Sequence, residues 1–189
     1  MAVAARPTLM TAAAIAILAL AGLAALLPLI KLPSGWVVGW LLLAAGVAEL
    51  VAGAARHSDG RLTAMIAGGA TTFAGLLFVT DSVVGLYPVS YVVTGWLFVR
   101  AAVLIASGFH AGTRLKPWAF FSGFADLMLG LILLLGLPVA ALVYNLFGST
   151  TEMVASFAVF LAISFLITGI SLLSLAAAER QLARRTVVL

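Results

Sequence analysis

Of the 189 residues, 65% are hydrophobic and 8% are charged, which leaves too little polar surface to cover a soluble globule. The chain contains no cysteine, so disulfides, thiolate metal sites and cysteine nucleophiles are excluded. The composition therefore predicts an all-α integral membrane protein, and the lipid bilayer is its first expected partner.

Six apolar runs are each long enough to cross about 30 Å of hydrocarbon as a helix. They span residues 8–29, 34–55, 62–85, 88–109, 117–136 and 151–178. The first run exceeds the apolar region of about 7–15 residues typical of a signal peptide, so we expect it to be retained. Residues 137–150 leave three alternatives open: a loop, an extension of the fifth helix or a short interfacial helix. Ser149 and Glu152 fit a capping box that opens the last helix. The runs together predict a single transmembrane domain over residues 1–189.

Basic residues gather on one side of the membrane when the six helices alternate in direction. They are Arg6, Arg56, Arg61, Arg114, Lys116, Arg180, Arg184 and Arg185, against Lys31 on the other side. The positive-inside rule predicts that the basic side, with both termini, is cytoplasmic. This sidedness accounts for the net charge of +4, so we expect no nucleic-acid partner.

Short motifs recur along the chain. The odd runs contain "GLAALLP" at 22–28, "GLLFVTD" at 75–81 and "GLILLLG" at 130–136, while the even runs contain "GWLLLAAG" at 39–46 and "GWLFVRAA" at 95–102. A motif that alternates in this way predicts three repeated helical hairpins, over about 8–57, 62–112 and 117–180.

Small residues lie seven apart in every run after the first. They are Gly39, Gly46 and Gly53; Gly68 and Gly75; Gly95 and Ala102; Gly123 and Gly130; and Ala162, Gly169 and Ala176. This spacing predicts a narrow packing seam and a compact bundle rather than a wide pore. The first run has Ile15 where the seam requires a small residue, so we expect it to pack more loosely. The GxxxG spacing of Gly35 and Gly39 leaves a homo-oligomer open.

Arg100 stands in the middle of an apolar run, where a charge costs about 2.5–3.5 kcal/mol or more. Arg100 and Asp126 lie thirteen residues to either side of the turn near residue 113, so antiparallel helices place them at matching depth. We expect the guanidinium to bind this carboxylate bidentately. Glu49 lies seven residues before Arg56, roughly 10 Å from the same membrane edge, and joins the pair if the second and fourth helices touch. One arginine with two acids has a net charge of minus one unless a carboxyl holds a proton.

Two interpretations of this cluster stay open. The charges either lock the helices in register, or they form a site for a proton or a small weak acid. His57 and His110, at the inner ends of their helices, are weaker candidates for sensing pH. The sequence has no phosphate-binding glycine loop, HExxH pair or serine elbow, so we expect no catalytic residues, metal or cofactor and no enzyme activity.

Three segments carry a resemblance to a known family. They are "GWLLLAAGVAEL" and "GWLFVRAAVL" in the even helices and "FFSGFADLMLGLILL" in the fifth. With the hairpin repeats they resemble the HdeD-type membrane proteins of bacterial acid resistance over nearly the whole chain. The most telling residues are Arg100, Asp126 and Glu49, whereas Asp81 departs from the proline usual in that family. The resemblance implies a multi-pass protein of the bacterial cytoplasmic membrane that is associated with acid stress.

Two other classes of function remain alternatives. One is a small proton-linked or weak-acid transporter or channel; small acetate-uptake proteins have a similar size, but their asparagine-proline signature is missing from the amino-terminal region. The other is a membrane scaffold or partner-binding protein that transports nothing.

Overall fold

The computed structural model describes residues 2–29, 35–56, 60–80, 89–110, 116–147 and 151–186. These residues form six α-helices: α1 (Ala2–Leu26), α2 (Gly35–Ala55), α3 (Arg61–Val79), α4 (Val89–His110), α5 (Lys116–Phe147) and α6 (Thr151–Thr186). Each of the six is long and apolar enough to cross a membrane. Within the described ranges the chain thus has the all-helical architecture of a multi-pass membrane protein.

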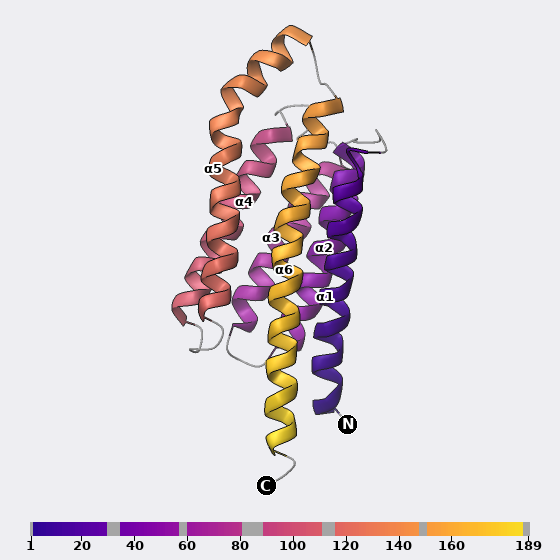
Figure 1. Ribbon diagram of the computed structural model, residues 1–189, viewed down its shortest axis with the longest axis vertical. Helices are drawn as coiled ribbons and strands as arrows, with labels where there is room; N and C mark the ends of the chain where they lie inside the picture. The colour runs from indigo at the N-terminus through magenta and orange to yellow at the C-terminus, as the bar shows by residue number, and fades with distance from the viewer. Residues whose placement is uncertain are drawn as a thin grey trace.

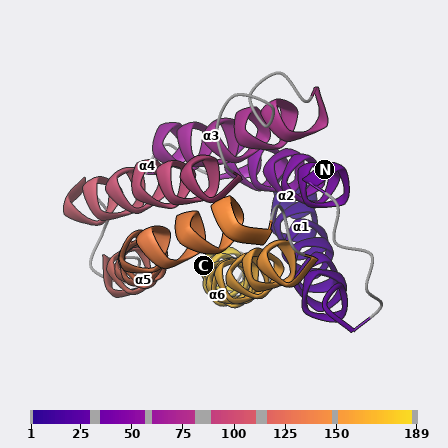
Figure 2. The ribbon, with the colours of Figure 1, turned by 90° about the horizontal axis from the view of Figure 1, so that it is seen from above.

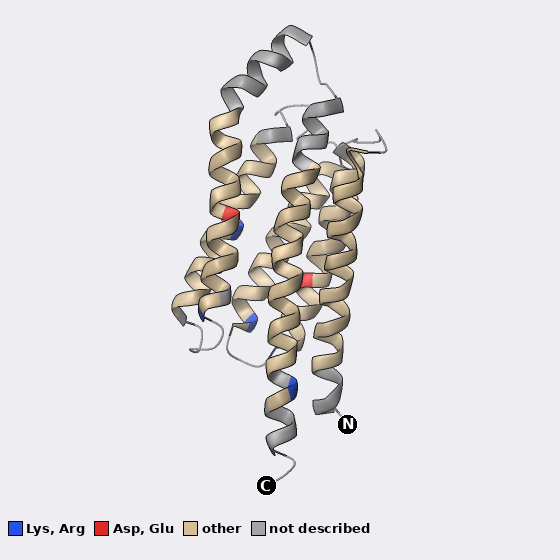
Figure 3. Ribbon diagram, viewed as in Figure 1, with Lys and Arg blue, Asp and Glu red and all other residues tan. Residues whose placement is uncertain are grey.

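The helices form a closed ring in which each contacts the next along the chain and α6 returns to α1 (Figures 1 and 2). Both termini lie at the same end of the bundle, which we call the terminal end (Figure 1). Figure 3 shows helices that are almost entirely free of charge, with most of the basic residues toward that end. The shared end of the termini agrees with the predicted topology, while the identity of that end as cytoplasmic stays a prediction.

The closest helix pairs are α2 with α3, α1 with α6, and α4 with α5. Each of these pairs joins helices from two different predicted hairpins, and the contacts within each hairpin are less extensive. The repeat of hairpin units therefore stays a sequence-based prediction, whereas the tight packing falls between an even helix and the odd helix beside it.

The predicted small-residue seam lies at these close pairs. Glycines from both sides of the α2–α3 interface have the partner's backbone where a Cβ atom would stand, and they are Gly39, Gly46, Gly53, Gly68 and Gly75. In α5, Gly123 faces the backbone of α4 at Ala101 and Ile105, and Gly130 lies beside Leu97 and Phe98 at ordinary contact distance. Gly169 of α6 faces Ala14 and Leu18 of α1. Gly95 departs from the prediction, since its missing Cβ would meet nothing within 4 Å.

The expectation that the first helix packs loosely is wrong. Helix α1 packs extensively along α6. Ile15, which interrupts the predicted seam, is 58% exposed, so it does not occupy this interface. Ala14 and Ile17 are fully buried instead and fill the contact. Helix α1 therefore contacts α6 through a different face from the one that the seven-residue spacing of small residues predicted.

Several helix boundaries differ from the predicted ones. Helix α1 begins at Ala2 and includes Pro7, which accepts a hydrogen bond from Thr11 through its carbonyl. Helix α3 ends at Val79 with Thr80 as its cap, before the predicted limit of 85. Of the three alternatives for 137–150, helix extension holds as far as Phe147, because α5 continues through this apolar stretch and so satisfies its own backbone groups. The predicted features at Asp81, Ser149 and His57 lie outside the described residues.

Candidate functional site

Arg100 is the centre of a buried ion-pair cluster that draws on three helices. Its side chain on α4 is 1% exposed. Its Nη2 lies 2.7 Å from Oε1 of Glu49 on α2, and its Nε lies 3.1 Å from Oδ2 of Asp126 on α5. The structure therefore brings together the three charged residues that the sequence singled out, including Glu49, whose place depended on an unverified helix contact.

The expected bidentate pairing of Arg100 with Asp126 is wrong. Each carboxylate contacts a different guanidinium nitrogen, since the acids approach from helices on different sides of α4. The third nitrogen, Nη1, is buried and has no hydrogen-bond partner among the described residues. A single arginine thus links α2, α4 and α5 and retains an unused donor.

Two further side chains complete the surroundings of Glu49. The hydroxyl of Thr71 on α3 lies 3.1 Å from Oε2 of Glu49 and 3.1 Å from the carbonyl oxygen of Ala67. The same hydroxyl accepts a 3.2 Å hydrogen bond from Nε1 of Trp96. The guanidinium carbon of Arg100 lies 5.5 Å from the centre of the Trp96 ring, within the range of a cation–π contact. Glu49 is therefore connected to the indole of Trp96 through one hydroxyl.

Helix α6 supplies two hydroxyls on the other side of the cluster. Ser164 donates a 2.6 Å hydrogen bond to Oδ1 of Asp126, and Nη2 of Arg100 donates to Oγ1 of Thr168. Thr168 in turn donates to the backbone carbonyl of Ser164 at 2.8 Å. Hydrogen bonds to charged groups are worth about 1.5–3 kcal/mol, so these hydroxyls offset part of the cost of burying the ions.

Sequence reasoning had missed Thr71, Trp96, Ser164 and Thr168 as members of the cluster. Thr71 lies three residues after Gly68, just as Asp126 lies three residues after Gly123, so this shared spacing was the available signal. Trp96 belongs to the Gly-Trp motif four residues before Arg100, one helical turn away. Ser164 and Thr168 are also four residues apart and so share a face of α6.

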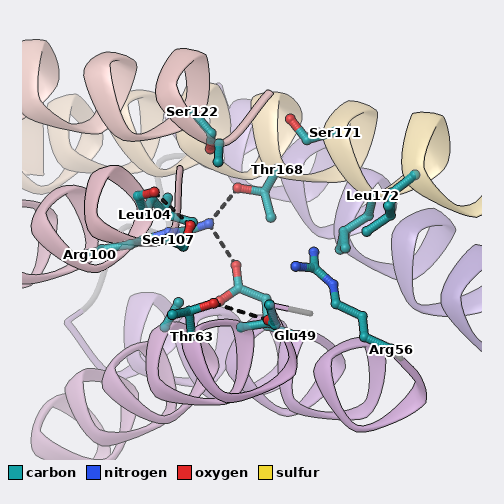
Figure 4. A pocket seen from close by; sticks show the side chains of 15 residues that line it. Glu49, Arg56, Thr63, Arg100, Leu104, Ser107, Ser122, Thr168, Ser171 and Leu172 are labelled. Atoms are coloured by element: carbon teal, nitrogen blue, oxygen red, sulfur yellow. Dashed lines mark hydrogen bonds and ion pairs between the residues drawn. The ribbon is translucent and has the colours of Figure 1, made fainter. Parts of the chain in front are cut away.

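A cavity of about 100 Å³ adjoins the cluster (Figure 4). It lies toward the terminal end, because its lining includes Arg56 and Gly60, which flank the connection between α2 and α3. Its lining comes from α2–α6 and from the turn before α3: Glu49, Arg56, Gly60, Thr63, Ala64, Ala67, Arg100, Leu104, Ser107, Ala119, Ser122, Thr168, Ser171, Leu172 and Leu175. A buried water needs about 10–15 Å³ of such volume, so there is room for several water molecules. Glu49 and Arg100 face this space, whereas Asp126 is not part of its lining.

Arg56 places a further positive charge near the cluster. From the sequence, this residue was used only to predict the membrane topology. Figure 4 shows its side chain extending into the cavity that Glu49 and Arg100 line. Arg56 also acts electrostatically on Glu49. Arg100, Glu49 and Asp126 together still have the predicted net charge of minus one when all three are ionised. Arg56, on the wall of the adjoining cavity, supplies a further positive charge that offsets it.

The bundle is mainly apolar on the other side of the cluster, although Thr94 of α4 is also buried there. The buried apolar residues on this side include Val38 and Leu42 of α2, Val93 and Leu97 of α4, Leu129 and Leu133 of α5, and Leu161 and Phe165 of α6. We call these residues the apolar layer. The cavity thus extends from the cluster toward the terminal end, while the apolar layer separates the cluster from the opposite end.

Comparisons with known proteins do not assign the chain to a family. The chain matches no family model, no curated protein and no solved structure. In the part of the chain that the structure describes, no three His, Cys, Asp or Glu residues come together as candidate metal ligands. The candidate site is therefore defined by the ion-pair cluster and its cavity alone.

Proposed function

We propose that this chain is an acid-stress protein of the bacterial cytoplasmic membrane, of the HdeD type, in which the cluster around Arg100 responds to protonation. The observation that carries the proposal is that Glu49 both pairs with the buried Arg100 and lines the cavity. Water that enters from the terminal end reaches this carboxylate, whereas Asp126 is held away from the cavity by Arg100 and Ser164. Glu49 is thus the carboxyl that we expect to take up the proton.

Protonation of Glu49 changes the contacts of three helices at once. A neutral Glu49 no longer balances Arg100, so the α2–α4 ion pair weakens. The hydroxyl of Thr71, which faces Oε2, must then rearrange, and with it the hydrogen bond from Trp96. If the positive-inside rule holds, the acidity that is sensed is that of the cytoplasm.

Trp96 offers a direct test of this response. In a variant that keeps Trp96 and replaces Trp36, Trp40 and Trp118 by phenylalanine, we expect indole emission to change when the medium is acidified. The reason is that the Trp96 Nε1 hydrogen bond ends on the hydroxyl that contacts Glu49. Fluorescence titration of the purified protein in lipid nanodiscs measures the change.

Two acid-to-amide variants in the same background decide whether Glu49 is responsible. Glu49→Gln should abolish the emission change, whereas Glu179→Gln, which removes an acid near the end of α6, should leave it intact. An emission change that persists in Glu49→Gln would show that another group titrates, and the proposal would fail.

Proton-linked transport of a weak acid is the second candidate, because the cavity extends from the cluster toward the terminal end of the bundle. Transport also requires that the apolar layer open toward the other side. Internal pH of sealed proteoliposomes after an external acid step, with and without acetate, separates the candidates. We expect no flux from the wild type; flux that disappears in folded Asp126→Asn would establish transport instead. A pure scaffold predicts neither flux nor a change in Trp96 emission.

A further inference from the structure

A residue that lines the cavity has a buried hydrogen-bond donor without a partner among the described residues. Arg100 lines the cavity and is 1% exposed, and its Nη1 has no hydrogen-bond partner within the described residues. An unpaired buried guanidinium nitrogen is costly, because its interaction with water is lost and not replaced. A group that enters the cavity with a free acceptor would satisfy it.

The charges around the cavity favour an anion over a cation when Glu49 is neutral. The cavity is lined by two basic residues, Arg56 and Arg100, and by one acidic residue, Glu49. The charged groups acting on Glu49 are Arg100 of α4, Asp126 of α5 and Arg56 at the end of α2, while α3 presents the Thr71 hydroxyl. Asp126 stays paired with Arg100 through Nε, which leaves Nη1 unused. Neutral Glu49 therefore leaves one positive charge in excess, which one monovalent anion would offset.

The remaining lining indicates which anion fits. Five hydroxyl-bearing residues also line the cavity: Thr63, Ser107, Ser122, Thr168 and Ser171. Four of these hydroxyls donate to nearby backbone carbonyls, so the two arginines are the charged donors that an anion would meet. Leucine and alanine side chains form the rest of the wall, among them Leu104, Leu172 and Leu175. A space of about 100 Å³ that is lined by two arginines and by leucine and alanine side chains suits a small carboxylate that carries a short alkyl group. A fully hydrated inorganic ion would leave the apolar wall unused.

We propose that this cavity binds a short-chain monocarboxylate between Arg56 and Arg100, with its alkyl group against Leu104, Leu172 and Leu175. The inference rests on the proposed function, because protonation of Glu49 releases positive charge for the ligand. Proton and anion binding are then mutually favourable, since each raises the affinity for the other by the same factor. The pair is equivalent to taking up one molecule of the undissociated acid.

Calorimetric titration with sodium acetate tests the site in the full-length protein in nanodiscs, in buffers that contain no carboxylate. We expect one acetate per chain, with an affinity that rises as the pH falls. Where Glu49 titrates, the uptake of one proton per acetate increases the affinity by up to about tenfold per pH unit. Sodium chloride at equal ionic strength should not compete. Chloride that competes as well as formate or propionate would overturn the assignment to a carboxylate.

Three variants separate a specific site from a general charge effect. Arg56→Gln should weaken acetate binding by about tenfold or more, because a charged hydrogen-bond donor is lost. Arg61→Gln is the matched control, since Arg61 stands five residues further along and does not line the cavity. Glu49→Gln should bind acetate with an affinity that no longer depends on pH. Equal losses in Arg56→Gln and Arg61→Gln, or no acetate binding by the wild type at any pH, would overturn the proposal.

Failure of this inference is distinguishable from failure of the proposed function. If Glu49 is protonated but the cavity takes no carboxylate, Trp96 emission still responds to acid and the calorimeter records no acetate binding. If the cavity binds acetate but Glu49 does not titrate, binding appears without pH dependence and Trp96 emission does not change with acid. The second result would refute the coupling to protonation while leaving a carboxylate site.

Discussion

Replacing Arg100 with glutamine is expected to lower the free energy of unfolding by about 3–5 kcal/mol, because it removes one partner of a buried ion pair and leaves the other uncompensated. Here two carboxylates are left, since Glu49 and Asp126 both contact the guanidinium and are 6% and 1% exposed. Glutamine preserves much of the side-chain volume but cannot balance the charge. Reversible unfolding in mixed micelles, followed by circular dichroism, measures the loss.

Neutralising Arg100 together with both of its acids provides the control for this prediction. The triple variant Arg100→Gln, Glu49→Gln and Asp126→Asn contains no buried charge among these three positions, so we expect it to recover most of the lost stability. Exchanging a complete buried ion pair for apolar groups of similar volume is often close to neutral in energy, and the amides used here likewise leave no uncompensated charge at these three positions. A triple variant as unstable as Arg100→Gln alone would show that packing and hydrogen bonds, rather than charge balance, hold the helices together here.

The pairing of Arg100 with Asp126 was predictable from the sequence because two antiparallel helices joined by a short turn fix the depth of each residue. Equal distances along the chain from that turn become equal depths in the membrane. Glu49 was less certain, since its contact with Arg100 requires α2 to face α4 across the bundle. The lengths of the apolar runs likewise sufficed to predict six helices, because a chain that crosses a membrane must satisfy its backbone hydrogen-bonding groups internally.

The contacts that could not be predicted depend on the rotational orientation of each helix about its own axis. Which guanidinium nitrogen meets which acid is set by that rotation, and the bidentate expectation failed for this reason. Arg56 illustrates the same limit, since its position at a helix end indicated topology but not that its long side chain extends back into the cavity. Thr71 and Ser164 became visible only once α3 and α6 were placed against the two acids.

Two adjacent glycines of α3 allow the packing seam to be tested with a matched pair of substitutions. We expect Gly68→Ala to lower the free energy of unfolding by about 1–3 kcal/mol through overpacking. A Cβ atom at residue 68 would lie 2.8 Å from the backbone nitrogen of Leu50 and 3.0 Å from Cβ of Glu49, so α2 must shift. A Cβ at Gly69 would meet nothing within 4 Å. Gly69→Ala should therefore be neutral, or stabilising by about 0.5–1 kcal/mol, because alanine restricts the unfolded chain.

The same pair of variants connects the seam to the charge cluster. Gly68 lies against the backbone of Glu49, so a shift of α2 at this point moves the carboxylate that approaches Arg100 to 2.7 Å. We therefore expect Gly68→Ala, but not Gly69→Ala, to change the pH at which Trp96 emission responds. Equal stability and equal titration in the two variants would show that α2 and α3 can separate without cost, and that the glycines do not position Glu49. The expected difference would instead make the close approach of these helices a condition for the cluster, because a bulkier residue at position 68 cannot leave Glu49 where Arg100 meets it.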